Sequence, residues 1–387
     1  MAFDPVGLAR ATGARAPFLI PMDDVQPQPL RAYGVVYRAL QDGGRGDWLL
    51  NWRGGAFVVH HPPALDECLT RGVLTEAVDD GAVRAAEAAG ETTSVQLEVA
   101  PRIAVYAPPY AAPWDDAVRL ALEYAEIRYE IVWDEALMGD GLAQIDWLHL
   151  HHEDFTGQYG KYGVGIRSSD WYRQAVRLDG ETAARLGFAD TPALKAAVAR
   201  AIRAFVERGG FLFAMCASTE TLDLAIGGTP PAYDATLAFR GYRLDPSDVG
   251  PFSTIDGHRV NTPGRLPLGA VELSSFSPSV DPVPAMLTQD HASAFPDWYG
   301  LTTSFHEETL KPGIVVLATS GAGLAKYVHG DLGEGTFTFL GGHDPEDPQH
   351  AVGDPPTDLS LYPRSPGYRL ILNNVLFPAA REEERIT

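Results

Sequence analysis

Cys216 is the residue whose type and surroundings point most directly to chemistry. It follows the apolar run FLFAM (211–215) and has small neighbours in Ala214, Ala217 and Ser218. A strand that turns sharply into a helix needs small neighbours, because the residue at the turn takes a strained conformation. The first N–H groups of such a helix lower the pKa of a thiol and can bind an oxyanion. The pattern therefore predicts a nucleophilic thiol, with a buried structural cysteine as the alternative.

A thiol nucleophile needs a base, and the base needs a carboxylate that orients it. The segment GGHDPED offers His343 with Asp344 and Glu346 close behind, again directly after an apolar strand candidate. We expect His343 to lie within hydrogen-bond reach of Cys216. Either Asp344 or Glu346 would hold the imidazole, and both assignments stay open.

A third polar cluster, HLHHED, follows another strand candidate. On a strand, His149 and His151 share one face, and Leu148 and Leu150 share the other. The chain has no HExxH motif and no closely spaced pair of cysteines, which are typical of zinc sites, so we expect no metal. The cluster is expected to line a substrate site together with the start of the helix after the thiol. The predicted substrate-binding residues are His151, His152, Glu153 and Ala217.

These candidates follow separate strands, so the fold must bring the strand ends together. From residue 102 onward, apolar runs of strand length alternate with segments of helical periodicity. This alternation is typical of an α/β fold with a mostly parallel sheet and helices on both faces, where ligands bind at the carboxyl ends of the strands. The predicted helices are 29–41, 113–125, 192–208, a segment from about 217, and 365–377.

The same pattern divides the chain into two parts. Residues 1–99 are expected to form a small N-terminal α/β unit, and residues 100–387 a larger α/β domain. A stretch at about 228–312, rich in Pro, Gly, Ser and Asp, interrupts the larger part as a long insertion. Strands are predicted again in GIVVLATS, GLAKYVHG and GTFTFLGGHD, before the last helix.

Composition excludes several classes of partner. With 30 basic and 51 acidic residues, the formal charge is −21, which disfavours nucleic acid and anionic membrane surfaces. No apolar run approaches the roughly 20 residues that span a bilayer, and no secretory signal is apparent. Cys68 and Cys216 form no disulfide framework, so we expect a cytoplasmic protein. No Rossmann or Walker glycine pattern is present, and we expect no cofactor.

The order of these motifs resembles the class I glutamine amidotransferase-like superfamily. The resemblance rests on DWLHLHHED, FLFAMCAS and GGHDPE, and it covers about residues 100–225 and 312–378. The stretch GEGTFTFLGGHDPED is also similar to the trehalose-utilisation (ThuA-like) branch. The superfamily implies a flavodoxin-like, doubly wound domain and a Cys–His–Glu triad, which here would be Cys216, His343 and Glu346.

Two features differ from the superfamily pattern. The elbow is Ala-Met-Cys-Ala-Ser instead of Gly-x-Cys-x-Gly, and Glu346 lies three positions after His343 instead of two. The second difference keeps Asp344 as a rival orienting residue. The N-terminal stretch LIPMDDVQPQPLRAYGVVYRAL resembles uncharacterised bacterial proteins labelled asparagine synthetase B. Ala2 stands where that synthetase has its cysteine, and its S-G-G-x-D-S loop is absent, so we do not carry that activity over.

Together these features predict a thiol-dependent hydrolase or amidotransferase-like enzyme that acts on the C–N bond of a small-molecule amide. Two alternatives stay open. One is a non-catalytic small-molecule-binding domain of the same fold, and the other is a metal-dependent enzyme that uses His149, His151 and His152. A homo-oligomer or a synthetase partner would be compatible with the resemblance.

Overall fold

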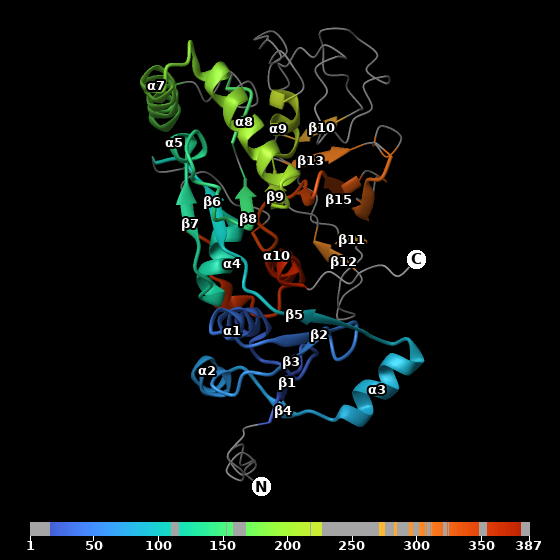
Figure 1. Cartoon of the computed structure of the whole chain (residues 1–387). Coiled ribbons are helices and arrows are strands. Elements are labelled where there is room, and N and C mark those ends of the chain that lie inside the picture. Colours follow the sequence, from blue (N-terminus) through green and yellow to red (C-terminus); the bar gives the residue numbers. More distant parts are fainter. Residues whose placement is uncertain are drawn as a thin grey trace.

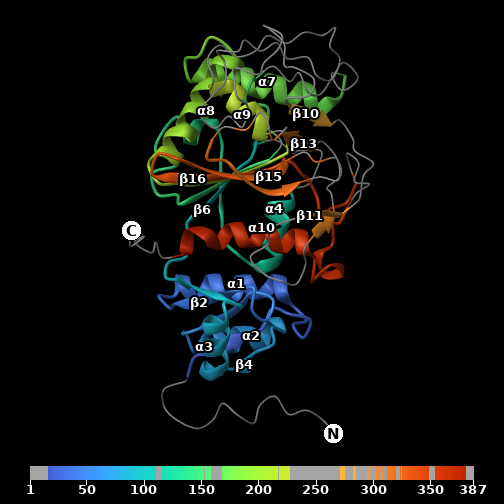
Figure 2. The same cartoon turned by 90° about the vertical axis from the view of Figure 1, so that its right-hand side faces the viewer.

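Figures 1 and 2 show the computed structural model of the chain. It describes residues 16–109, 116–151, 153–157, 168–216, 218–226, 271–274, 282–284, 294–296, 302–305, 307, 310, 312–319, 323, 325–347 and 354–380. Most of the predicted insertion at about 228–312 lies outside the described residues, as do His152 and Ala217.

Residues 18–97 build a small sheet with helices packed around it. Over the described residues, its strands are antiparallel and lie in the order β4-β1-β3-β2-β5. The predicted helix over 29–41 is confirmed, and Pro29 occupies its first turn, where a proline N–H is not needed. The elements are β1 (Phe18–Ile20), α1 (Pro29–Gln41), β2 (Gly46–Leu50), β3 (Ala56–Val59), α2 (Ala64–Arg71), β4 (Glu76–Ala77), α3 (Asp80–Ala89) and β5 (Thr93–Leu97).

Most of the remaining strands join a second sheet, which has nine strands when counted over the described residues. The strands at one end of this sheet are parallel and lie in the order β7-β6-β8-β9-β16, which is 2-1-3-4-5 when they are numbered along the chain. The strands of the second sheet are β6 (Ile103–Tyr106), β7 (Glu130–Val132), β8 (Trp147–Leu150), β9 (Phe211–Met215), β10 (Val271–Ser274), β13 (Thr302–Phe305), β14 (Val315–Thr319), β15 (Ala325–Leu332) and β16 (Gly335–Leu340). Strands β11 (Pro282–Pro284) and β12 (Ala294–Pro296) form a separate pair.

The expected parallel α/β sheet is therefore confirmed for the strands from β7 to β16 only. Strands β15, β14, β13 and β10 continue the sheet in antiparallel fashion. A two-residue turn joins β15 to β16, with Gly333 at a φ of 64°. Such a short turn can only connect antiparallel strands.

Helices cover both faces of the parallel strands. Because successive side chains point to opposite faces, Trp147 and Phe213 enter one core cluster, while Leu148 and Leu212 enter the other. Helices α4 and α10 contribute to the first cluster, and α8 and α9 contribute to the second. The helices are α4 (Ala117–Ala125), α5 (Asp134–Leu137), α7 (Asp170–Arg185), α8 (Thr191–Glu207), α9 (Ser218–Ile226) and α10 (Pro366–Leu376), with short 3-10 turns η6 (Leu359–Leu361) and η7 (Phe377–Ala379).

Two of these helices differ from the sequence-based predictions. Helix α7, which packs on α8, is not predicted by the apolar pattern. Its buried face consists of small and polar residues, Ala175, Asp179, Thr182 and Ala183, so it lacks the large apolar stripe of a core helix. Helix α4 begins at Ala117 instead of Pro113, because Asp116 has an extended backbone and caps the helix with its side chain.

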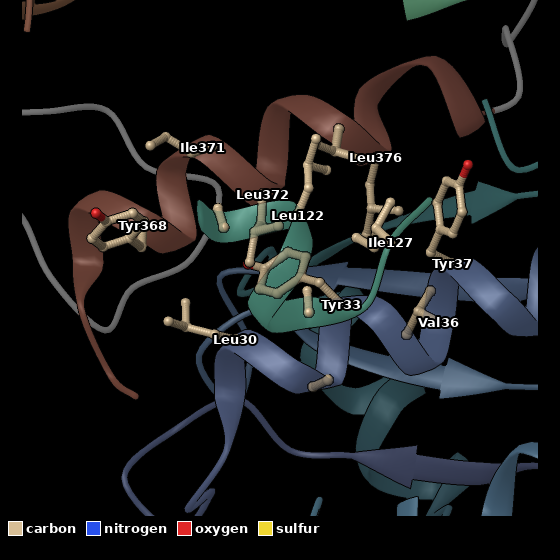
Figure 3. Close-up of a cluster of buried hydrophobic side chains, with 14 of the residues drawn as sticks. Leu30, Tyr33, Val36, Tyr37, Leu122, Ile127, Tyr368, Ile371, Leu372 and Leu376 are labelled. Carbon is tan, nitrogen blue, oxygen red and sulfur yellow. The ribbon is translucent and has the colours of Figure 1, made fainter. Parts of the chain in front are cut away.

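One core cluster is continuous between the two sheets. Figure 2 shows α10 lying between the large sheet and α1. In Figure 3, Tyr33 of α1 lies beside Leu122 of α4 and Leu372 of α10. Helices α1 and α4 approach so closely that a Cβ atom on Gly34 would lie 1.7 Å from the carbonyl oxygen of Ala125. Helix α1 therefore belongs to the layer that covers the large sheet.

Buried polar contacts also tie α10 to α1 and to the connections of the small sheet. The hydroxyl of Tyr33 donates to Oδ1 of Asn373 at 2.5 Å. The buried guanidinium of Arg369 donates to the carbonyls of Met22 at 3.0 Å and Gly54 at 2.6 Å. Burying a charge without such partners would be costly, so these carbonyls fix the position of α10 against the small sheet.

Candidate active site

The predicted site residues gather at one edge of the large sheet. Cys216 follows β9, His343 follows β16 and His151 follows β8, each at the carboxyl end of a parallel strand. The connections leave β6 in opposite directions, because β7 and β8 lie on its two sides. Ligands of doubly wound sheets bind at such a switch point. His151, which follows β8, lies at this switch point, whereas Cys216 and His343 follow the next two strands along the sheet.

Cys216 occupies the turn between β9 and α9 with a φ of 51°, a left-handed conformation that residues other than glycine rarely adopt. Its N–H donates to the carbonyl of Leu340 at 3.0 Å, which fixes the turn against β16. Its own carbonyl accepts from the hydroxyl of Thr219 at 2.7 Å. The Cys216 side chain is buried. The sharp strand-to-helix turn expected from the small neighbouring residues is therefore present.

Cys68, the other cysteine, lies in a different setting. It is buried in α2 and belongs to the core cluster that is continuous between the two sheets. Burial raises the pKa of the Cys68 thiol to about 12, with a smaller contribution from Glu67. This thiol is therefore protonated and unreactive near neutral pH.

The end of β8 is tied to the start of α9. The carbonyl of His151 accepts from the N–H of Ser218 at 3.1 Å and from its hydroxyl at 2.7 Å. The Glu153 carboxylate accepts from the N–H of His151 at 2.9 Å, and the Glu153 carbonyl accepts from the Thr221 hydroxyl at 2.9 Å. His151 and Glu153 thus lie beside the turn that carries Cys216, while His152 and Ala217, also predicted for this site, lie outside the described residues.

His343 is buried, and its imidazole ring lies with its centroid 5.0 Å from that of His151. Directly after it, the Asp344 carboxylate holds the loop together. Oδ1 accepts from the N–H groups of Glu346 at 2.9 Å and Asp347 at 3.2 Å, and Oδ2 accepts from the hydroxyl of Thr357 at 2.7 Å. Asp344 therefore has a clear structural role.

Glu346 is half-buried on the same loop. Burial raises the pKa of its carboxyl, a hydrogen bond with Ser365 opposes this shift, and the nearby Asp344 carboxylate adds to it. A carboxyl group in such a setting gains from a positive partner.

Asp116 also lies at this edge of the sheet. It caps α4, and its Oδ1 accepts from the N–H groups of Val118 at 2.9 Å and Arg119 at 3.2 Å. The same oxygen lies 3.2 Å from Nε2 of His149 and 3.3 Å from Nδ1 of His151. Burial on its own would raise the pKa of Asp116, but the two imidazoles hold it well below its usual range. Asp116 is therefore an ionised carboxylate facing two buried histidines.

The sequence pattern does not single out Asp116 as a site residue. An aspartate before an apolar helical segment is typical of an N-cap, and that signal is present. Its contact with His149 depends on β6 and β8 being neighbours in the sheet, which the sequence does not reveal. The predicted orientation of His149 and His151 toward one face is confirmed, since both approach Asp116 while Leu148 and Leu150 pack in the opposite core.

No protein-family model matches the chain, and no curated protein matches it. Among solved structures, it is similar to the cytoplasmic proteins STM3548 (Salmonella typhimurium; 11% identity, TM-score 0.37, 73% of this chain and 100% of that chain) and STM1381 (Salmonella typhimurium LT2; 12%, 0.36, 72% and 100%). It is also similar to a beta-galactosidase from Bacillus circulans sp. alkalophilus (12%, 0.31, 72% of this chain and 31% of that chain). These TM-scores are too low to carry an argument about fold or function.

Across the described part of the chain, no helix has both the length and the apolar character needed to cross a membrane.

Proposed function

We propose that the protein is a thiol-dependent hydrolase or amidotransferase-like enzyme that cleaves the C–N bond of a small amide. In this proposal Cys216 is the nucleophile, His343 is the general base, and Glu346 or Asp344 orients the imidazole. The strand order 2-1-3-4-5 supports the flavodoxin-like, doubly wound fold that the proposal assumes.

The observation that carries the proposal is the left-handed backbone of Cys216 at a φ of 51°. A side chain in this region costs about 1–2 kcal/mol, and such strain is concentrated at functional sites. A cysteine that only fills space gains nothing from the conformation. A nucleophile gains a side chain presented at the sheet edge, in front of a helix N-terminus.

The proposed reaction has two steps. His343 takes the proton of the Cys216 thiol, and the sulfur attacks the amide carbon to form a tetrahedral oxyanion, for which the N–H of Ala217 is the expected donor. The C–N bond then breaks, and His343 returns the proton to the leaving amine. Water next attacks the thioester with His343 as base, which releases the carboxylic acid and restores the thiol.

Of the two orienting candidates, Glu346 is favoured. Both oxygens of Asp344 already accept hydrogen bonds within the loop, from two backbone N–H groups and from Thr357.

The proposal also includes location and partners. A catalytic thiol with no disulfide framework suits a reducing cytoplasm. The charge of −21 supports a small-molecule substrate over nucleic acid or an anionic membrane surface. The reaction needs no cofactor. If the released ammonia is used, a synthetase partner would consume it.

The test uses a glutamine-analogue chloroketone on the native full-length chain, followed by mass-spectrometric mapping. We expect one adduct, on Cys216, that is absent from the Cys216→Ser variant and from Cys68. If Cys216 stays unmodified under conditions in which the denatured chain reacts fully, the non-catalytic binding domain becomes the better assignment.

A further inference from the structure

Three buried or half-buried side chains converge at the switch point of the sheet: Asp116, His149 and His151. The carboxylate oxygen of Asp116 lies 3.2 Å from Nε2 of His149 and 3.3 Å from Nδ1 of His151. One potential ligand atom from each residue lies within 4.8 Å of the other two. The side chains of both histidines are almost completely buried, and that of Asp116 is 13% exposed.

The hydrogen bond of His149 to a backbone carbonyl determines which form of its Nε2 atom faces Asp116. Its Nδ1 lies 3.0 Å from the carbonyl oxygen of Phe213, which can only accept, so Nδ1 carries the hydrogen. In a neutral imidazole, Nε2 then turns a lone pair toward the Asp116 carboxylate. Two lone-pair atoms 3.2 Å apart repel each other unless a cation lies between them or His149 carries a second proton. A backbone carbonyl on the far ring nitrogen is also the usual partner of a metal-binding histidine.

Two of the three separations between potential ligand atoms also match those around a bound metal ion. Zinc bonds to nitrogen and oxygen of about 2.0–2.1 Å place two ligands of a tetrahedron roughly 3.3–3.4 Å apart. The distances of 3.2 and 3.3 Å from the Asp116 oxygen are close to this value. The rings of Trp147 and Phe213 lie 6.0 Å and 5.6 Å from that of His149, which gives the cluster a rigid apolar surrounding.

We propose that Asp116, His149 and His151 bind one divalent transition metal ion, with zinc as the best match. Two imidazoles and one carboxylate are a ligand set that such ions favour, and three protein ligands leave a fourth position open. This inference goes beyond the proposed function, because it uses neither Cys216 nor His343. The spacing of the histidines along the sequence predicts no metal, whereas the folded chain adds a third ligand from another strand end.

The test measures zinc binding to the full-length chain after treatment with a chelator and removal of that chelator. Competition with a chromophoric zinc indicator should give one site per chain. The critical variant is Asp116→Asn, because asparagine is an equally good N-cap and preserves the start of α4. We expect it to weaken zinc binding by at least the roughly 10–100-fold that even an outer-shell partner contributes.

The matched control is Asp79→Asn. Asp79 caps α3 through the same two-bond pattern, to the N–H groups of Gly81 and Ala82, but the described structure places no histidine pair beside it. This variant should bind zinc like the wild type. Zinc should raise the melting temperature of the wild type and of Asp79→Asn, and leave that of Asp116→Asn unchanged.

Cobalt provides a second readout. A Co²⁺-loaded chain should show the visible bands of a tetrahedral nitrogen–oxygen site without a thiolate charge-transfer band, and Cys216→Ser should not alter the spectrum. Absence of stoichiometric zinc binding by the wild type would overturn the proposal and assign the cluster as an ion pair between Asp116 and a doubly protonated His149. Equal zinc affinity of Asp116→Asn and the wild type would overturn it too, as would a cobalt–thiolate band.

Discussion

The imidazole rings of His151 and His343 lie with their centroids 5.0 Å apart and their planes at 39°. These residues follow β8 and β16, and β9 lies between those two strands in the sheet. Cys216, which follows β9, is therefore flanked on both sides by strand ends that carry a buried histidine. Each of the following predictions depends on this arrangement or on the helices that support it.

The His343→Gln substitution should slow the alkylation of Cys216. If His343 takes the thiol proton, its removal lowers the thiolate fraction at pH 7, and the rate with iodoacetamide should fall on the order of 10-fold. His329→Gln is the control, because this histidine of β15 has its own partner in Thr338 at 3.1 Å. Peptide mapping after timed quenching gives the rates, and equal rates in the two variants would exclude His343 as the base.

Replacing Cys216 by glycine and by alanine separates strain from packing. Alanine keeps a Cβ atom at the φ of 51° and loses only the buried sulfur, which should cost less than about 1 kcal/mol. Glycine relieves strain of about 1–2 kcal/mol and adds an entropic cost of roughly 0.5–1 kcal/mol. The glycine variant should therefore be at least as stable as the alanine variant.

Urea unfolding in reducing buffer measures this difference. A glycine variant that is less stable than the alanine variant by more than about 1 kcal/mol would mean that the turn at Cys216 holds no strain. The structural basis for the proposed nucleophile would then be lost.

Asp344 and Glu346 should respond differently to substitution. Asp344→Ala removes the acceptor for two backbone N–H groups and the Thr357 hydroxyl, and should cost about 1–3 kcal/mol. Glu346→Gln should instead stabilise the protein at neutral pH. Urea unfolding of both variants at pH 7 gives the comparison, and a destabilised Glu346→Gln variant would contradict it.

The expected gain in stability of the Glu346→Gln variant follows from the raised pKa of Glu346. Between the ordinary and the raised pKa, the folded chain holds more protons than the unfolded chain, so the free energy of unfolding falls as pH rises. Glutamine does not ionise, so the Glu346→Gln variant does not lose this stability as pH rises. The advantage of the variant should appear above that window and vanish below about pH 4, where the carboxyl of the wild type is protonated in both states.

Gly34→Ala should be strongly destabilising. The new Cβ atom would lie 1.7 Å from the carbonyl oxygen of Ala125, so α1 and α4 would have to separate. We expect a loss of about 3 kcal/mol or more. Gly180→Ala on α7 is the matched control, because nothing lies within 4 Å of its Cβ position, and it should gain roughly 0.5–1 kcal/mol. Similar melting temperatures for both variants would contradict the close helix contact.

Several elements could be predicted because their signals are local. The proline at the start of α1, the apolar run of β9 and the small residues around Cys216 each determine a short piece of backbone. They do so without help from distant residues. The strand-to-helix turn at Cys216 follows from such signals, and so does the placement of His343 after a strand.

The missed features depend on distant contacts. Asp116 reaches His149 only because β6 pairs with β8, and that pairing leaves no trace in the spacing of residues along the chain. Helix α7 buries small and polar side chains, including Asp179, so its periodicity is not apolar. The buried Arg369 of α10 finds its acceptors in the carbonyls of Met22 and Gly54, which lie in connections of the small sheet more than 300 positions earlier in the chain.

The contact between Tyr33 and Asn373 has a consequence for how the chain is made, since the two residues are 340 positions apart. At about 5–20 residues per second, a ribosome needs roughly 20–70 s to progress from one to the other. Throughout that time the apolar side of α1 lacks its partner in α10, because Asn373 is made 340 positions after Tyr33. We therefore expect α1 to be the segment of the nascent chain that most needs a chaperone.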